Sequence, residues 1–188
     1  MKKVIVALFL LLTIENAVAV KGAYIAFGQG SGSGTEQRRF TDNLWGGTTK
    51  VDVGFDVTLT DFKVGVVFES DNRFELSSTS IDAKFSSWTE KFTGTDFDWI
   101  FTAEKGEADF LAFMLVGFGT YEFERLSLRG AAFNFGLGVY VPVSDNVEVE
   151  LAYKMKAIGW DEYDIGGNTS LYALESIDYV YVGAKYKF

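Results

Sequence analysis

The feature that most constrains the fold is a strict two-residue alternation of apolar and polar side chains, clearest in residues 179–188, YVYVGAKYKF. In an extended chain every second side chain points to the same face. One face of this segment carries Val180, Val182, Ala184, Tyr186 and Phe188. The other face carries two lysines and a glycine. The segment is therefore predicted to be a strand with one apolar face and one charged face.

Seven further stretches share this period, at residues 20–29, 50–59, 62–69, 96–102, 108–121, 133–141 and 146–157. A very short turn at Thr60–Asp61 is predicted to join two of them into a hairpin, and Pro142–Asp145 is predicted to join the last pair. In 20–29 we expect Ala23, Ile25 and Phe27 to share the outer face. Segment 108–121 is apolar on both faces, so its register stays open, although its glycines and aromatic residues favour a strand over a helix.

The connections between the predicted strands alternate in length. Long polar connections occupy residues 30–49, 70–94, 122–130 and 158–175, and the others are short. Eight strands with tight turns at one end and long loops at the other are typical of an antiparallel up-and-down transmembrane β-barrel. The alternation continues within 72–88, so ten strands remain an alternative.

The first nineteen residues have the pattern of a secretory signal peptide. Lys2 and Lys3 precede an apolar run of about ten residues, and Ala17–Ala19 has the small residues of a cleavage site. The run is shorter than the roughly 20 residues that a membrane-spanning helix needs. We expect residues 1–19 to be removed on export and residues 20–188 to form one domain, the barrel.

Composition narrows the class of protein. The chain has a formal net charge of −9 and no cluster of basic residues, which disfavours nucleic-acid binding. Because it contains no cysteine, it can form neither disulfides nor thiolate metal sites. Its 20 glycines, one proline and 16% aromatic residues favour extended structure over a helical bundle or a disordered chain.

The charged faces of the predicted strands carry six cations and seven anions, close to neutrality in an acidic chain. An unpaired buried charge costs several kcal/mol, so this balance favours ion pairs enclosed by a narrow barrel over a solvated face. The glycines on the same faces fit an interior with room only for side chains. The residues predicted to point inward are Lys50, Asp52, Asp56, Lys63, Glu69, Asp96, Asp98, Glu148, Glu150, Lys154, Lys156, Lys185 and Lys187. A secreted soluble β-sandwich, with its apolar faces inward, is the alternative.

The terminal Phe188, with Tyr186 two residues before it and Ala184, Val182 and Val180 in the same alternation, resembles the C-terminal signature of Gram-negative outer-membrane proteins. Over its length the chain is similar in layout to the small eight-stranded barrels of the outer-membrane protein A transmembrane-domain and protein X type. The resemblance implies a monomer in the outer membrane, in contact with the lipid bilayer and lipopolysaccharide. It also implies recognition of the last residues by the barrel assembly machinery.

Candidate catalytic and binding motifs are weak. Outer-membrane barrels that act as enzymes use a catalytic histidine, and this chain has none, so no enzymatic activity and no cofactor are expected. Residues 28–34, GQGSGSG, lack the ending of a phosphate loop and are predicted to be a flexible loop. Acidic residues at 161, 162 and 164 lack the spacing of a calcium hand. We expect the lipid headgroup boundary to be the place of Trp45, Trp88 and Trp160, and contact with a partner is the alternative.

The sequence thus predicts a non-enzymatic outer-membrane barrel with a structural or surface-interaction role through long extracellular loops. A small-solute channel is the first alternative and the soluble sandwich the second. At eight strands the lumen should be filled, which disfavours the channel.

Overall fold

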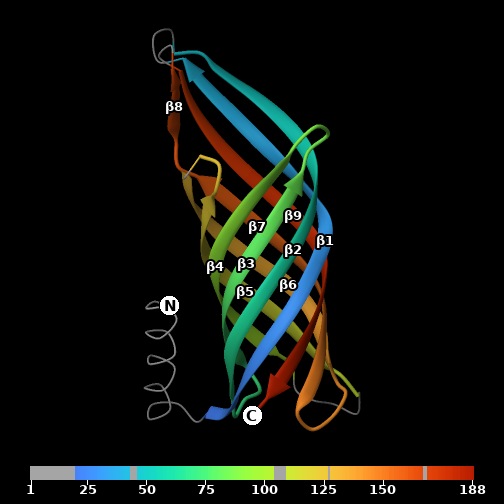
Figure 1. Ribbon diagram of the computed structural model, residues 1–188. Coiled ribbons are helices and arrows are strands. Elements are labelled where there is room, and N and C mark those ends of the chain that lie inside the picture. Colours follow the sequence, from blue (N-terminus) through green and yellow to red (C-terminus); the bar gives the residue numbers. More distant parts are fainter. Residues whose placement is uncertain (1–19, 43–45, 104–108, 127, 167–168) are drawn as a thin grey trace.

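The computed structural model describes residues 20–42, 46–103, 109–126, 128–166 and 169–188, and the side chains of 163–166 lie outside the description. Within these residues the chain forms nine strands joined by turns (Figure 1). No helix among them is long and apolar enough to cross a membrane. The strands are β1 (Val20–Asp42), β2 (Thr48–Phe68), β3 (Arg73–Lys84), β4 (Thr89–Thr102), β5 (Leu111–Phe123), β6 (Leu128–Pro142), β7 (Val147–Trp160), β8 (Tyr163–Gly166) and β9 (Thr169–Lys187).

Eight of these strands close into a ring. Each strand from β1 to β6 pairs antiparallel with the next, β7 pairs with β9, and β9 pairs with β1. The short β8 pairs with the start of β9 and is not one of the eight. The predicted fold, an eight-stranded antiparallel up-and-down barrel, is confirmed. A closed ring also excludes the two-sheet sandwich, because a sandwich leaves its sheets open at their edges.

The assignment of strands to the ring differs from the prediction in one place. Residues 50–59 and 62–68 belong to the single strand β2, and Thr60–Asp61 is no turn. The missing ring strand is β3, which lies within residues 70–94, predicted as a connection. Strand β3 pairs along its whole length with β4, so this alternation reflects a strand of the ring itself.

The predicted long loops are largely strand as well. Strand β1 continues to Asp42 and β2 begins at Thr48, so most of the expected loop 30–49 is a paired hairpin. The glycine-rich segment 28–34 lies within β1, and the prediction of a flexible loop there is wrong. A Cβ at Gly28 or Gly30 would collide with the rings of Tyr181 and Tyr179, so these glycines make room for tyrosines inside the ring.

The two ends of the ring are distinct. The first residues of β1, the C-terminus and the turns 69–72 and 143–146 lie at one end, here the base. The turn 85–88, residues 124–126 and the far ends of β1, β2 and β9 lie at the other, here the tip (Figure 1). Strands β1, β2 and β9 rise higher than the other ring strands, and the register keeps them paired as far as Thr41–Thr48 and Asp42–Thr169.

Near the base the outward side chains are large and apolar. This apolar belt consists of Ile25, Phe27, Phe62, Phe97, Trp99, Phe101, Met114, Phe118, Phe133, Leu137, Leu151, Tyr153, Met155, Val180, Val182, Tyr186 and Phe188, with exposures between 39% and 72%. The preferred outer face of 20–29 is confirmed by Ile25 and Phe27. The open register of 108–121 is also settled, with Met114 and Phe118 outward and Phe113 and Leu115 inward.

Above the belt the pattern reverses within the same strands. In β2, Phe62 points outward in the belt, but Phe55, Val57 and Leu59 nearer the tip are buried inside, opposite exposed Thr58. The other ring strands from β3 to β5 change from outward aromatic or aliphatic residues to outward threonine, serine or charged residues in the same direction. Strand β9 changes between Val180 and Ser176. The lower part of the barrel is therefore apolar outside, whereas the upper part is apolar inside.

Candidate functional site

The residues of the predicted assembly signal all lie on the outer face of β9, the strand that closes the ring against β1. Val180, Val182, Tyr186 and Phe188 are 62%, 52%, 48% and 72% exposed, and Ala184 is exposed between them. Phe188 donates its backbone N–H to the carbonyl of Ala23 at 2.9 Å, so the last residue is held at the ring closure. The five side chains thus form the part of the apolar outer surface that β9 contributes. Their role in assembly remains a prediction.

Inside the belt, six charged side chains form a lower ionic cluster. It consists of Asp61, Lys63, Glu75, Glu150, Lys154 and Lys185, three carboxylates and three ammonium groups. Lys63 Nζ lies 3.3 Å from Glu75 and 3.4 Å from Glu150, although the three residues come from three different strands. Lys154 lies 2.7 Å from Glu150, and Lys185 contacts both glutamates. The balanced charges offset part of the desolvation cost of burying them.

Tyrosines fill the space around this cluster. Tyr24 donates a hydrogen bond to Glu75 at 2.6 Å, and Tyr181 donates one to Asp61 at 2.7 Å. Lys154 lies 3.7 Å from the centre of the Tyr181 ring, within the range of a cation–π contact. Each ring therefore fills volume and also contacts a buried charge.

Two smaller groups continue the interior toward the base and the tip. At the base, Glu148 accepts from Arg73 at 2.6 Å and pairs with Lys187 at 3.1 Å. Above the lower ionic cluster, Asp96 pairs with Lys156 at 2.8 Å and accepts from Tyr121 at 2.7 Å and from Asn134 at 2.9 Å. Asn134 also donates to Asp98 at 3.0 Å.

The structure therefore gathers most of the predicted interior charges inside the ring. Those buried or partly buried there are Lys63, Asp96, Asp98, Glu148, Glu150, Lys154, Lys156, Lys185 and Lys187. The prediction is wrong for Lys50, Asp52, Asp56 and Glu69, which are exposed. The first three lie in the upper part of β2, where polar residues point outward, and Glu69 lies in the turn after this strand.

Several interior residues were missed by sequence reasoning because their segments were assigned to loops. Arg73 and Glu75 alternate with Phe74 and Leu76, and this period of two was the signal available. Glu175 follows Leu171 and Ala173 in one buried stripe of β9, where a glutamate interrupts an apolar pattern. Asp61 was missed because it was placed in a turn.

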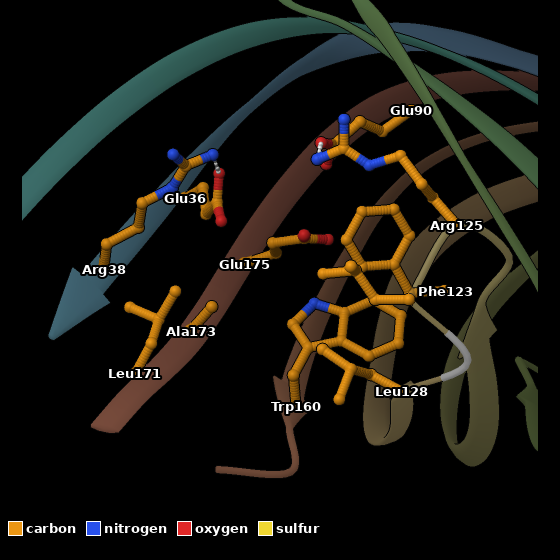
Figure 2. Close-up of a pocket in the computed structure, with 11 residues that line it drawn as sticks. Glu36, Arg38, Glu90, Phe123, Arg125, Leu128, Trp160, Leu171, Ala173 and Glu175 are labelled. Atoms are coloured by element: carbon orange, nitrogen blue, oxygen red, sulfur yellow. Dashed lines mark hydrogen bonds and ion pairs between the residues drawn. The ribbon is translucent and has the colours of Figure 1, made fainter. Parts of the chain in front are cut away.

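A cavity of about 80 Å³ opens at the tip above an apolar layer of the interior (Figure 2). The rings of Phe92, Phe123 and Trp160 pack together below it, with centroids 5.1 to 5.9 Å apart. Trp160 is 3% exposed, so its predicted place at the headgroup boundary is wrong. Trp88 instead lies at the β3–β4 turn, stacked on Phe85, and Trp45 lies outside the described residues.

Three buried glutamates face this cavity. Glu36 pairs with Arg38 at 2.7 Å, and Glu90 pairs with Arg125 at 3.3 Å. Glu175 lies between these pairs and is 2% exposed, and its Oε2 has no hydrogen-bond partner among the described residues (Figure 2). The described part of the chain holds no group of histidine, cysteine or acidic residues arranged to bind a metal ion. Of the acidic residues at 161, 162 and 164, the first two are exposed, and the side chain of the third lies outside the described residues.

The cavity lies above the apolar belt, since Ser176 and Asp178 hold the outward positions of β9 between Glu175 and Val180, the uppermost belt residue of this strand. Burial raises the pKa of Glu175 to about 8. The nearby Trp160 N–H opposes this rise, although it forms no hydrogen bond of normal geometry with the described residues, and the carboxylates of Glu36 and Glu90 add to it. Burial also raises the pKa of Glu90. At neutral pH Glu175 is therefore mostly protonated.

Comparison with known proteins supports the fold and not a family. No protein-family model matches the sequence, and no curated protein matches it. Among solved structures, the chain is similar to Neisserial surface protein A, with a TM-score of 0.58 and 14% identity over 90% of this chain and 99% of that one. A second similar structure is the outer membrane protein OprG of Pseudomonas aeruginosa, with a TM-score of 0.43 and 11% identity over 91% of this chain and 98% of that one. A third is the outer membrane protease OmpT of Escherichia coli, with a TM-score of 0.44 and 9% identity over 91% of this chain and 99% of that one. At such identities the first likeness shows the barrel fold alone.

Proposed function

We propose that this protein is a non-enzymatic barrel of the Gram-negative outer membrane with a structural or surface-interaction role. The observation that carries the proposal is the reversal of side-chain polarity along the strands. An exposed apolar belt favours hydrocarbon, and a water-soluble barrel would have no reason to change to the opposite pattern partway along strands β2 to β5 and β9. The level at which the pattern changes is the expected boundary between acyl chains and headgroups.

The surface available for interaction is a raised sheet and not a set of long loops. Strands β1, β2 and β9 extend well above the belt and carry polar and charged groups such as Arg39, Lys50 and Asp52. In the proposed orientation this sheet stands outside the cell, where lipopolysaccharide is the first molecule that it meets. The assembly machinery would bind the exposed edge of β9 before the ring closes.

The absence of histidine supports a role without catalysis. In addition, the carboxylates of Asp96 and of the lower ionic cluster are engaged in ion pairs within the ring. A channel is disfavoured because Lys63, Glu75, Glu150 and Lys185 are at most 1% exposed. An apolar layer that includes Leu59, Ile81 and Ile158 lies above them. Together they fill the lumen.

The natural lack of cysteine makes a labelling test clean. Three variants on one strand, Thr58→Cys, Phe62→Cys and Val57→Cys, place a thiol outside above the belt, outside within the belt and inside the barrel. In lipid vesicles, a membrane-impermeant maleimide should react with the first at least about tenfold faster than with the other two, because a thiol in hydrocarbon or in a packed interior is inaccessible. Equal labelling of the Thr58 and Phe62 variants in vesicles would contradict the membrane assignment.

The same reagent on intact cells tests the location. Thr58→Cys should be labelled from outside, whereas Ser144→Cys, in the exposed β6–β7 turn at the base, should be labelled only after the outer membrane is permeabilised. Labelling of the Ser144 variant and not of the Thr58 variant on intact cells would show the reverse orientation. If neither is labelled before permeabilisation, the protein is not in the outer membrane.

A further inference from the structure

We infer that the tip cavity is a binding site for a small organic monocation, whose ammonium group pairs with Glu175 and whose apolar part packs on Trp160 and Phe123. Nothing in the fold requires this cavity, because the barrel is already closed and its lower interior already filled. Its lining combines a buried glutamate that has one oxygen without a hydrogen-bond partner, aromatic rings and a rim that is open to the tip.

The charges of the lining define the ligand's charge. Arg38 and Arg125 supply two positive charges, each paired with one glutamate, against three carboxylates. Glu175 belongs to neither of these two pairs, and its Oε2 is buried without a hydrogen-bond partner among the described residues. When Glu175 is ionised, its unsatisfied buried oxygen is costly, and one added positive charge would balance the three carboxylates. Glu175 also points into the space between the two pairs, so a ligand there can reach it (Figure 2).

The remaining residues of the lining determine which uncharged part of a ligand can fit beside its ammonium group. Leu128, Leu171 and Ala173 surround the cavity together with the rings of Phe123 and Trp160. Indole is the aromatic group that attracts cations most strongly, and apolar walls favour an alkyl chain over a hydrated metal ion. The volume of about 80 Å³ is roughly half that of a cavity that admits benzene, about 150 Å³, so the site fits an ammonium group with a short chain.

The site is also coupled to protons. The charged groups that face Glu175 are Glu36, Glu90, Arg38 and Arg125. Because burial raises the pKa of Glu175 to about 8, a cation must displace a proton from it below that pH. With this pKa, binding of a permanently charged ammonium should weaken roughly 100-fold between pH 9 and pH 6.

The test is a calorimetric titration of the folded protein in detergent micelles with n-butylammonium chloride at pH 9 and constant ionic strength. This amine, like that of lysine with a pKa of about 10.4, is still charged at pH 9. We expect saturable binding, weaker at pH 6, and at least about tenfold weaker for Glu175→Gln, which keeps the side-chain shape. Glu122→Gln, an exposed carboxylate on the outer face of β5, is the matched control and should bind like the parent protein.

Three outcomes would overturn the inference. They are no binding at millimolar n-butylammonium, equal binding of the uncharged 1-butanol, and competition by sodium at concentrations similar to those of the amine. Equal affinity of the Glu175→Gln variant would overturn it as well. A shift in gel mobility on heating confirms that each variant is folded. Because the titration is done in micelles, its failure leaves the proposed membrane role untouched, and failure of the labelling test leaves this inference untouched.

Discussion

At the scale of single residues, Lys185 tests how much the lower ionic cluster depends on each charge. Its ammonium contacts Glu75 and lies 3.2 Å from Glu150 and 3.3 Å from the Tyr140 hydroxyl, and all four residues are fully buried. Lys185→Met keeps most of the side-chain volume but leaves two carboxylates short of a cation. We expect the free energy of unfolding to fall by about 3–5 kcal/mol, measured by urea denaturation in micelles with tryptophan fluorescence.

Lys21→Met is the matched control for this prediction. Lys21 also pairs with a carboxylate, Asp71 at 2.7 Å, but both side chains are exposed, by 59% and 37%. The loss should stay below about 1 kcal/mol, because solvent screens such pairs. Adding Glu75→Gln to Lys185→Met should restore part of the lost stability. Equal effects of the two lysine substitutions would show that burial does not set the strength of the cluster.

At the scale of strands, two glycines of β2 differ in what surrounds them: Gly65 faces the tyrosine-filled interior, and Gly54 faces the open outer surface. A Cβ at Gly65 would meet the Tyr24 ring and the Phe74 carbonyl, whereas a Cβ at Gly54 would meet nothing within 4 Å. Gly65→Val should therefore destabilise the barrel by about 1–3 kcal/mol through overpacking. Gly54→Val, with the same gain in strand propensity, should be neutral or slightly stabilising. Urea midpoints of the two variants check this, and a tolerated Gly65→Val would mean that Tyr24 can move aside.

Strands also show how far sequence reasoning reaches. The period of two identified strands wherever one polarity rule held along the segment, as in β7, where Glu148, Glu150, Lys154 and Lys156 all point inward as expected. It failed in β2, because the inward stripe runs from Phe55 through Leu59 to Asp61 and Lys63, and thus changes from apolar to charged without changing face. In the sequence this change has the pattern of a new strand with the opposite phase, so periodicity predicts a turn at its centre. Periodicity alone does not reveal at which residue a strand leaves the bilayer.

The tip cavity lay beyond prediction for a related reason. Glu36, Glu90 and Glu175 are far apart in the sequence, and only the closure of β9 against β1, together with the register of β4, brings them to one place. The stripe of Leu171, Ala173 and Glu175 marked one unusual acid. Its neighbours depend on strand assignments that the polarity reversal obscured.

At the scale of the whole molecule, the layers of the interior predict that the barrel does not conduct ions. A permeating ion would have to pass the apolar layer around Ile81 and Ile158, both 0% exposed, and then the lower ionic cluster, whose groups are bonded to one another. Eight strands leave interior room only for side chains, so there is no wider path. Planar bilayer recordings should show no steady open conductance, under conditions in which a sixteen-stranded porin gives clear steps. The control is Leu59→Phe, which enlarges a side chain of the apolar layer. Reproducible open steps in both the parent protein and this variant would contradict the prediction. They would mean that the lower ionic cluster is mobile enough to admit water and that the barrel serves as a channel more than as a surface protein.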